Sequence, residues 1–289
     1  MIRKHILAIT VLVLMSPSGS LATLVTAEQE KTFTSDGVIQ EGDFYGGVAV
    51  YDTPPSHTTV NMTGGTVGEP LDADSGLYAY DSSQVNISGG QVLYLHTTDA
   101  STVNITGGTV GNWDLGGLVS VDTYGSSVIN LYKGGEITGG TYNFFHMHDS
   151  STLNVYGGGV YVFFTLDNNS TLNLYDGWIF DLSISGTANV YGGRIQSWGL
   201  FTISGDGQLN VYGQDFQYDT QWKWEDDPPA GGGPRWISRL TGTGFDGVAI
   251  DIQDIPDPYT APNINLIPEP TTFALLALGV LALAKHPAS

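Results

Sequence analysis

The sequence predicts an all-β protein whose body is a single-stranded parallel β-helix, and three observations support this prediction. One short unit recurs eight times along the chain. Within each unit the apolar residues alternate with polar ones, which is the period of a strand with one buried face. The units follow one another at spacings of 16 to 26 residues, and such self-similarity is typical of a solenoid that buries its apolar faces by stacking. The rule for parallel crossovers favours right-handed winding.

Each unit consists of a small or polar residue, an apolar residue, Asn, an apolar residue and Thr, Ser or Tyr, and Gly-Gly usually follows. The units read TVNMTGG at 59–65, QVNISGG at 84–90, TVNITGG at 102–108, VINLYKGG at 128–135, TLNVYGG at 152–158, TLNLYDG at 171–177, TANVYGG at 187–193 and QLNVYG at 208–213. Because glycine tolerates positive φ, we expect Gly-Gly to form a turn. The fourth unit carries one inserted residue.

A second alternating stretch follows most units before a polar corner leads into the next one. These stretches read LYAY at 77–80, VLYL at 92–95, LVSV at 118–121, FFHM at 144–147 and VFFTL at 162–166. We therefore expect two or three short strands in each turn of the helix. A leucine-rich repeat is the main alternative solenoid, but its longer Leu pattern and helical side are absent. A β-sandwich with irregular strands would not need eight near-copies of one motif.

The repeat divides the chain into five segments. Residues 1–27 precede the body, 28–56 form an atypical first rung and cap, and 57–213 are the repeated β-helix. Residues 214–267 break the repeat with a polar loop at 221–229 and a glycine run at 231–233. A strand pair, WISRL at 236–240 and VAIDI at 248–252, follows them, and we expect this hairpin to cover the last rung, because an open sheet edge invites aggregation.

Residues 1–27 have the pattern of a secretory signal peptide. A positive start at Arg3 to His5 precedes a short apolar run from Ile6 to Met15. Small residues then provide two cleavage sites, after Ala22 and after Ala27. The sequence therefore predicts export.

The C-terminal segment, 268–289, pairs a short motif with a second apolar run. Pro268-Glu269-Pro270 precedes Phe273 to Ala284, and Lys285 and His286 follow. Counted from Thr271, the 14 residues to Ala284 would form a short apolar helix of about 21 Å, whereas a usual membrane span needs about 20 residues.

This ending resembles the PEP-CTERM sorting signal of bacterial surface proteins, and the body resembles the glycine-rich, autotransporter-like and pectate-lyase-like solenoids found among such proteins. The resemblance implies an exported protein that is held transiently in the inner membrane and processed by an exosortase-type transpeptidase. Pro268, Glu269 and Pro270 would then be recognition residues of a substrate. The destination would be the cell surface or the extracellular matrix, in association with exopolysaccharide. The basic tip departs from the family pattern, because Lys285-His286 stands where the family has an arginine run.

Charge and composition exclude several function classes. The 289 residues carry a formal net charge of −20, and acidic residues exceed basic ones along the whole body. A nucleic-acid partner is therefore not expected, because phosphate binding needs Lys and Arg. The chain has no Cys, which excludes disulfides, thiolate metal sites and cysteine nucleophiles.

The strongest candidate binding surface is a double column of Asn and Tyr. The repeated Asn lies between two inward apolar residues, so strand alternation points it outward, and the residue two positions later points the same way. In the last five units that residue is Tyr. The column is expected to contain Asn130, Tyr132, Asn154, Tyr156, Asn173, Tyr175, Asn189, Tyr191, Asn210 and Tyr212. Such columns either stabilise the rungs as stacked ladders or contact sugar rings of a glycan.

Two further sets of residues are candidate metal ligands. Asp81, Asp99 and Asp149 occupy the same corner of successive units, where they either bond nearby backbone N–H groups or supply oxygens to Ca²⁺. His146 and His148 lie two apart on one face of an expected strand, beside Asp149, and could form part of a Zn²⁺ or Cu²⁺ site. Neither pattern requires a cofactor, and no cofactor is predicted.

The sequence gives little support for catalysis. No serine-hydrolase, zinc-protease, phosphate-loop or dinucleotide motif occurs. A polysaccharide lyase would need a basic residue near carboxylates, and only Lys133 and Arg194 lie in the repeated body. We therefore expect a structural or adhesive surface protein, with a polysaccharide-degrading β-helix enzyme as the alternative.

Overall fold

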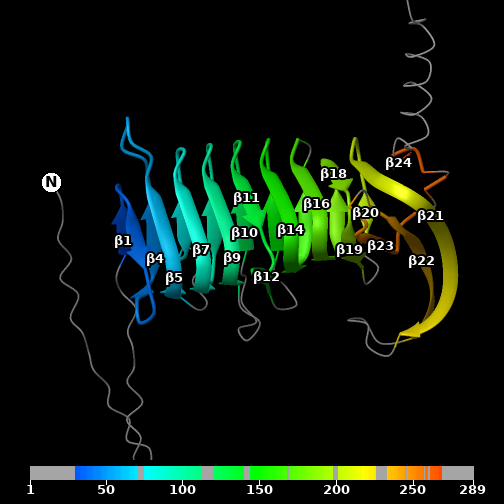
Figure 1. Ribbon diagram of the computed structural model, residues 1–289, viewed down its shortest axis with the longest axis horizontal. Coiled ribbons are helices and arrows are strands. Elements are labelled where there is room, and N and C mark those ends of the chain that lie inside the picture. Colours follow the sequence, from blue (N-terminus) through cyan, green and yellow to red (C-terminus); the bar gives the residue numbers. More distant parts are fainter. Residues whose placement is uncertain are drawn as a thin grey trace, which may run out of the picture.

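The computed structural model describes residues 30–69, 75–111, 120–139, 144–167, 169–197, 201–225, 233–244, 246–256, 258–259 and 261–268. Within these ranges the protein is all-β, and its stacked parallel strands form the predicted β-solenoid. Figure 1 shows the strands in a row, from β1 at one end to the long curved strands β21 and β22 at the other. The expected signal peptide, Glu269, Pro270 and the expected helix at 273–284 lie outside the described residues.

One side of the solenoid is a sheet of nine parallel strands. In spatial order these are β1 (Glu30–Phe33), β4 (Gly47–Val50), β6 (Leu77–Ala79), β8 (Leu95–Thr97), β10 (Ser120–Thr123), β13 (Phe144–Met147), β15 (Phe163–Leu166), β17 (Leu182–Ile184) and β20 (Thr202–Ile203). Five of these strands, β6, β8, β10, β13 and β15, overlap the second alternating stretches of the repeat, whereas β1 and β4 precede the first unit. β8 starts later than its sequence pattern suggests, since it begins at Leu95.

The other side is a sheet of fifteen strands, which contains the Asn units. Its members are β2 (Gly37–Ile39), β3 (Phe44–Tyr45), β5 (Thr59–Val67), β7 (Gln84–Val92), β9 (Thr102–Val110), β11 (Val128–Leu131), β12 (Glu136–Thr138), β14 (Thr152–Tyr161), β16 (Thr171–Phe180), β18 (Thr187–Val190), β19 (Gly193–Gln196), β21 (Gln208–Glu225), β22 (Gly233–Thr243), β23 (Ala249–Gln253) and β24 (Ile264–Pro268). The successive Asn residues are register partners across it, for example Asn86 with Asn104.

The core lies between the two sheets and follows the predicted alternation. The apolar residues on either side of the repeated Asn are fully buried, as at Val85 and Ile87. The apolar residue that follows the glycines is also buried in the first seven units, as at Val110. Buried serines add a polar element that the sequence analysis did not predict: Ser83, Ser101, Ser127, Ser151 and Ser170 line the inside of one corner.

Gly-Gly adopts the expected positive φ, but in five of the units it forms a bend inside a continuous strand and not a turn between two strands. β5, β7 and β9 each run through their glycine pair. The second glycine has positive φ, 84° at Gly90 and 75° at Gly108, and the register shifts beside it. The chain therefore changes direction while its ladder of hydrogen bonds is kept. Two units are interrupted at this place: residues 132–135, which include the inserted Lys133, separate β11 from β12 in the fourth unit, and residues 191–192 separate β18 from β19 in the seventh.

The C-terminal region is more regular than the sequence predicted. The expected hairpin exists as β22 and β23, which pair antiparallel. The residues before it form no loop up to Glu225, because β21 continues to that residue and pairs antiparallel with β22. β23 also pairs parallel with β19 and so closes the last rung, while β24 adds a parallel strand to β21. None of the described residues forms a helix of the length and apolarity needed to cross a membrane.

Candidate functional site

A continuous ladder of amide hydrogen bonds runs along the outside of the larger sheet. Each Asn Nδ2 donates to the Oδ1 of the Asn one rung earlier, at 2.8–2.9 Å. Its members are Asn61, Asn86, Asn104, Asn130, Asn154, Asn173, Asn189, Asn210 and Asn265. Since every internal amide both donates and accepts, the ladder fixes the register of neighbouring rungs.

The last member of this ladder, Asn265, was missed by the sequence analysis. Its side chain donates to Asn210 at 2.8 Å and also to Gln208. The sequence does carry the apolar-Asn-apolar pattern of the units here, because Asn265 lies between Ile264 and Leu266. This pattern was not recognised as a ninth unit, because no Gly-Gly follows it and more than fifty residues separate Asn265 from Asn210.

The five tyrosines form the expected column beside the Asn ladder. Their rings stack nearly parallel, with centroids 4.5–5.1 Å apart and interplanar angles of 6–18°. Because the ring faces are turned toward one another, the column presents ring edges and hydroxyl groups to solvent. Burial first, and then the neighbouring tyrosines, raise the pKa of Tyr156 and of Tyr191. The geometry therefore favours hydrogen bonding to a ligand over stacking of sugar rings on the faces.

The corner aspartates accept hydrogen bonds from backbone N–H groups. Asp81, Asp99 and Asp149 all have positive φ, between 54° and 59°. The Oδ2 of Asp81 accepts from the N–H of Asp52, that of Asp99 from the N–H of Asp81, and that of Asp149 from the N–H of Gly125. Each carboxylate thus joins its corner to the corner one rung earlier, and the corner itself uses the left-handed backbone that Asp tolerates in turns.

His146 and His148 share one face, as predicted, but their carboxylate partners differ from our expectation. The carboxylate of Asp149 accepts a hydrogen bond from the backbone N–H of Gly125. Instead, Oδ1 of Asp122 lies 3.8 Å from Nδ1 of His146, and Oδ2 of Asp167 lies 2.6 Å from Nδ1 of His148. Both aspartates belong to neighbouring rungs, so spacing along the sequence could not identify them.

The histidine pair belongs to a second aromatic row, on the smaller sheet, that sequence reasoning missed. His148 stacks on Tyr124 with centroids 4.4 Å apart, and His96 lies tilted 5.3 Å from the same tyrosine. Burial lowers the pKa of His96, against an opposing effect of Asp122. Further toward β1, Tyr51 and Tyr80 stack at 4.4 Å.

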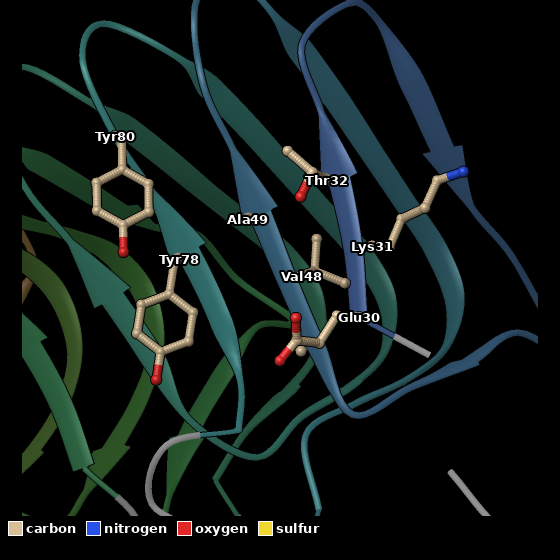
Figure 2. A pocket seen from close by; sticks show the side chains of 8 residues that line it. Glu30, Lys31, Thr32, Val48, Ala49, Tyr78 and Tyr80 are labelled. Carbon is tan, nitrogen blue, oxygen red and sulfur yellow. The ribbon is translucent and has the colours of Figure 1, made fainter. Parts of the chain in front are cut away.

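This row ends at a shallow hollow of about 190 Å³ near the N-terminal edge. Figure 2 shows Tyr78 and Tyr80 on one side of the hollow and Glu30 and Lys31 of β1 on the other. The hollow exists because Ala49, the register partner of Tyr78, is much smaller than the tyrosine. Its lining combines aromatic and charged groups.

Of the basic residues considered for a lyase, Arg194 is engaged in the cap. Its Nε lies 3.4 Å from Oδ2 of Asp251, and its guanidinium lies over the ring of Trp178. Arg239 binds the same carboxylate through two hydrogen bonds, of 2.7 and 2.9 Å. This cluster joins β16, β19, β22 and β23, which is a structural role.

No family model matches the chain, and no curated protein or solved structure matches it.

Proposed function

We propose that the protein is an exported component of a bacterial cell surface or extracellular matrix, with a structural and adhesive role. The solenoid provides a stiff rod, and the outer face of the larger sheet meets exopolysaccharide. The signal-peptide pattern and the Pro-Glu-Pro ending support export and sorting by an exosortase-type transpeptidase. On this proposal the chain is a substrate of that enzyme, held transiently in the inner membrane before release.

The observation that carries the adhesive role is the repetition of identical polar groups at the rung spacing. Tyrosine rings follow one another every 4.5–5.1 Å, beside Asn amides that follow the same rungs. Tyr132 and Tyr156 are 37% and 43% exposed, so this row is open to a large ligand. A polymer with regularly repeated hydroxyl groups can form many weak hydrogen bonds with such a row at once, and linked contacts of this kind raise the overall affinity.

The adhesive proposal is tested with the full chain and the exopolysaccharide of its host. A Tyr156→Phe/Tyr175→Phe double variant removes two hydroxyl groups but keeps the ring stack, so the fold should be retained. We expect co-sedimentation with the polysaccharide to fall in this variant, and to persist in the matched variant Tyr259→Phe, which changes an exposed tyrosine outside the column. Equal binding by all three proteins would reject the adhesive role. Release of reducing or unsaturated ends from the polysaccharide would favour the alternative, a polysaccharide-degrading enzyme.

The sorting proposal needs a separate test in the host cell. Replacing Glu269 and Pro270 by Ala should leave the chain in the inner-membrane fraction, whereas the unaltered chain should reach the cell surface or the medium. The same distribution for both chains would reject this part of the proposal and leave the adhesive role untouched.

A further inference from the structure

We propose that Asp122, His146 and His148 form a binding site for a divalent transition-metal ion on the outer face of the smaller sheet. In the part of the chain that the structure describes, this is the group of three metal-ligating side chains whose ligand atoms all lie within 4.8 Å of one another. The inference is independent of the proposed adhesive function, because the site lies on the other sheet.

The solenoid brings the three ligands together. Asp122 of β10 and His146 of β13 are register partners, so they occupy the same outward position on adjacent rungs. His148 follows His146 on the same face, two residues later. Rungs lie about 4.8 Å apart, and ligand atoms around a zinc ion lie roughly 2.0–2.2 Å from the metal. The observed separation of 3.8 Å between Asp122 Oδ1 and His146 Nδ1 therefore needs only a small rotation of the side chains to close around an ion.

Groups outside the trio already orient two of its members. The hydroxyl of Tyr94 donates to Oδ2 of Asp122 at 2.8 Å, while Oδ1 is the oxygen nearer to His146. Nδ1 of His148 lies 2.6 Å from the carboxylate of Asp167, and the ring stacks on Tyr124. Metal-binding histidines usually donate one ring nitrogen to a carboxylate in this way, which fixes the orientation of the other. The arrangement assigns Nε2 of His148 to the ion.

The surroundings allow an ion to enter and favour its charge. The side chains of Asp122, His148 and His146 are 17%, 27% and 40% exposed, so the site is reached from solvent without opening the fold. The chain carries a formal net charge of −20, which raises the local concentration of cations.

The ligand set selects the class of ion. Two imidazole nitrogens and one carboxylate suit zinc, copper, nickel or iron, whereas Ca²⁺ and Mg²⁺ prefer a shell of oxygens. Three protein ligands leave a coordination position for water or for a further ligand, as in open zinc sites. Zn²⁺ is therefore the probe for the test, and Ca²⁺ is its control.

The test is a calorimetric titration of the full chain, stripped of metal with a chelator, with ZnCl₂. We expect one equivalent of Zn²⁺ to bind and to raise the melting temperature, and we expect an excess of Ca²⁺ not to compete.

Asp167→Asn should weaken zinc binding about 10–100-fold, the usual effect of losing a carboxylate that orients a ligand histidine. His146→Gln and Asp122→Asn should weaken it further. His57→Gln is the matched control, since His57 also pairs with an aspartate, Asp52 at 3.0 Å, but lies outside the trio; it should bind zinc as the unaltered chain does.

A measurement on the unaltered chain keeps the inference testable if the variants fold poorly. X-ray absorption of the zinc-loaded protein should show two imidazole ligands, with nitrogens at about 2.0–2.1 Å. A shell of oxygens alone, unchanged zinc affinity in His146→Gln, or equal loss in His57→Gln would each overturn the proposal.

Discussion

At the scale of single residues, glycine at the bend of each unit meets two requirements. The first is positive φ, which residues with a Cβ adopt at a cost. The second is close approach, because neighbouring rungs bend at the same place. A Cβ added at Gly90 would lie 2.6 Å from backbone atoms of the preceding rung, whereas one at Gly42, which also has positive φ, would have nothing within 4 Å. A substitution at Gly42 therefore tests positive φ alone, whereas one at Gly90 tests positive φ and close approach together.

We predict that Gly42→Ala lowers the free energy of unfolding by about 1–2 kcal/mol, the cost of the left-handed backbone alone. Gly90→Ala should lose about 1–3 kcal/mol more, because the rungs must separate to admit the methyl group. Urea unfolding followed by far-UV circular dichroism measures both values. Equal losses would show that close approach of the rungs contributes nothing.

Residues whose role is repeated in every unit were predictable from the sequence, whereas residues whose role is set by another rung were not. The outward Asn and Tyr follow from strand alternation, so their columns were predictable. The partners of His146 and His148 were not, because Asp122 and Asp167 are neighbours only after the solenoid has wound. The aspartate beside them in sequence, Asp149, has its carboxylate on the backbone of Gly125 instead.

At the scale of elements, each rung is stabilised by contact with a similar rung, so the repeated Asn and Tyr side chains lie against copies of themselves. This is favourable for neutral amides and phenols and unfavourable for charges. Burial, followed by the charge of Tyr51, raises the pKa of Tyr80 to about 12. Tyr156 and Tyr191 are shifted in the same direction for the same reasons.

We predict a loss of stability at alkaline pH that depends on these tyrosines. A phenol whose pKa is higher in the folded chain than in the unfolded chain stabilises the fold fully below pH 10.0, and this contribution is lost as the pH rises toward about 12. Tyr80→Phe cannot ionise and should therefore show a shallower decline over this range. Urea midpoints measured across the range for both proteins provide the test, and parallel curves would contradict it.

Strand positions within the repeat were predictable because a period of two is a strong signal, but strand ends and corners were not. Gly-Gly was expected to form a turn, yet in most units the strand continues through it, as in β5, β7 and β9, and only the fourth and seventh units are divided there. The extension of β21 to Glu225 was missed for the opposite reason: this stretch pairs antiparallel with β22 outside the repeat, so no neighbouring copy indicated it.

At the scale of the whole molecule, a solenoid is limited by its ends. The rung that contains β19 would expose its edge if β23 did not pair with it. β23 is held in place by antiparallel pairing with β22, in which Leu240 and Ile252 are register partners, and both side chains are fully buried. The cap thus protects both the hydrogen-bonding edge and the apolar core of the last rung.

We predict that Leu240→Asp detaches this cap and makes chains associate end to end. An uncompensated buried charge costs roughly 3–5 kcal/mol, and the freed edge of β19 offers unpaired N–H and C=O groups to another chain. Size-exclusion chromatography with light scattering should show a mass that rises with protein concentration. Gln217→Asp introduces the same charge at an exposed position of β21, so it should leave the mass unchanged. If the mass of Leu240→Asp equals that of the unaltered protein at every concentration, β22 and β23 are not what keeps one solenoid from pairing with the next.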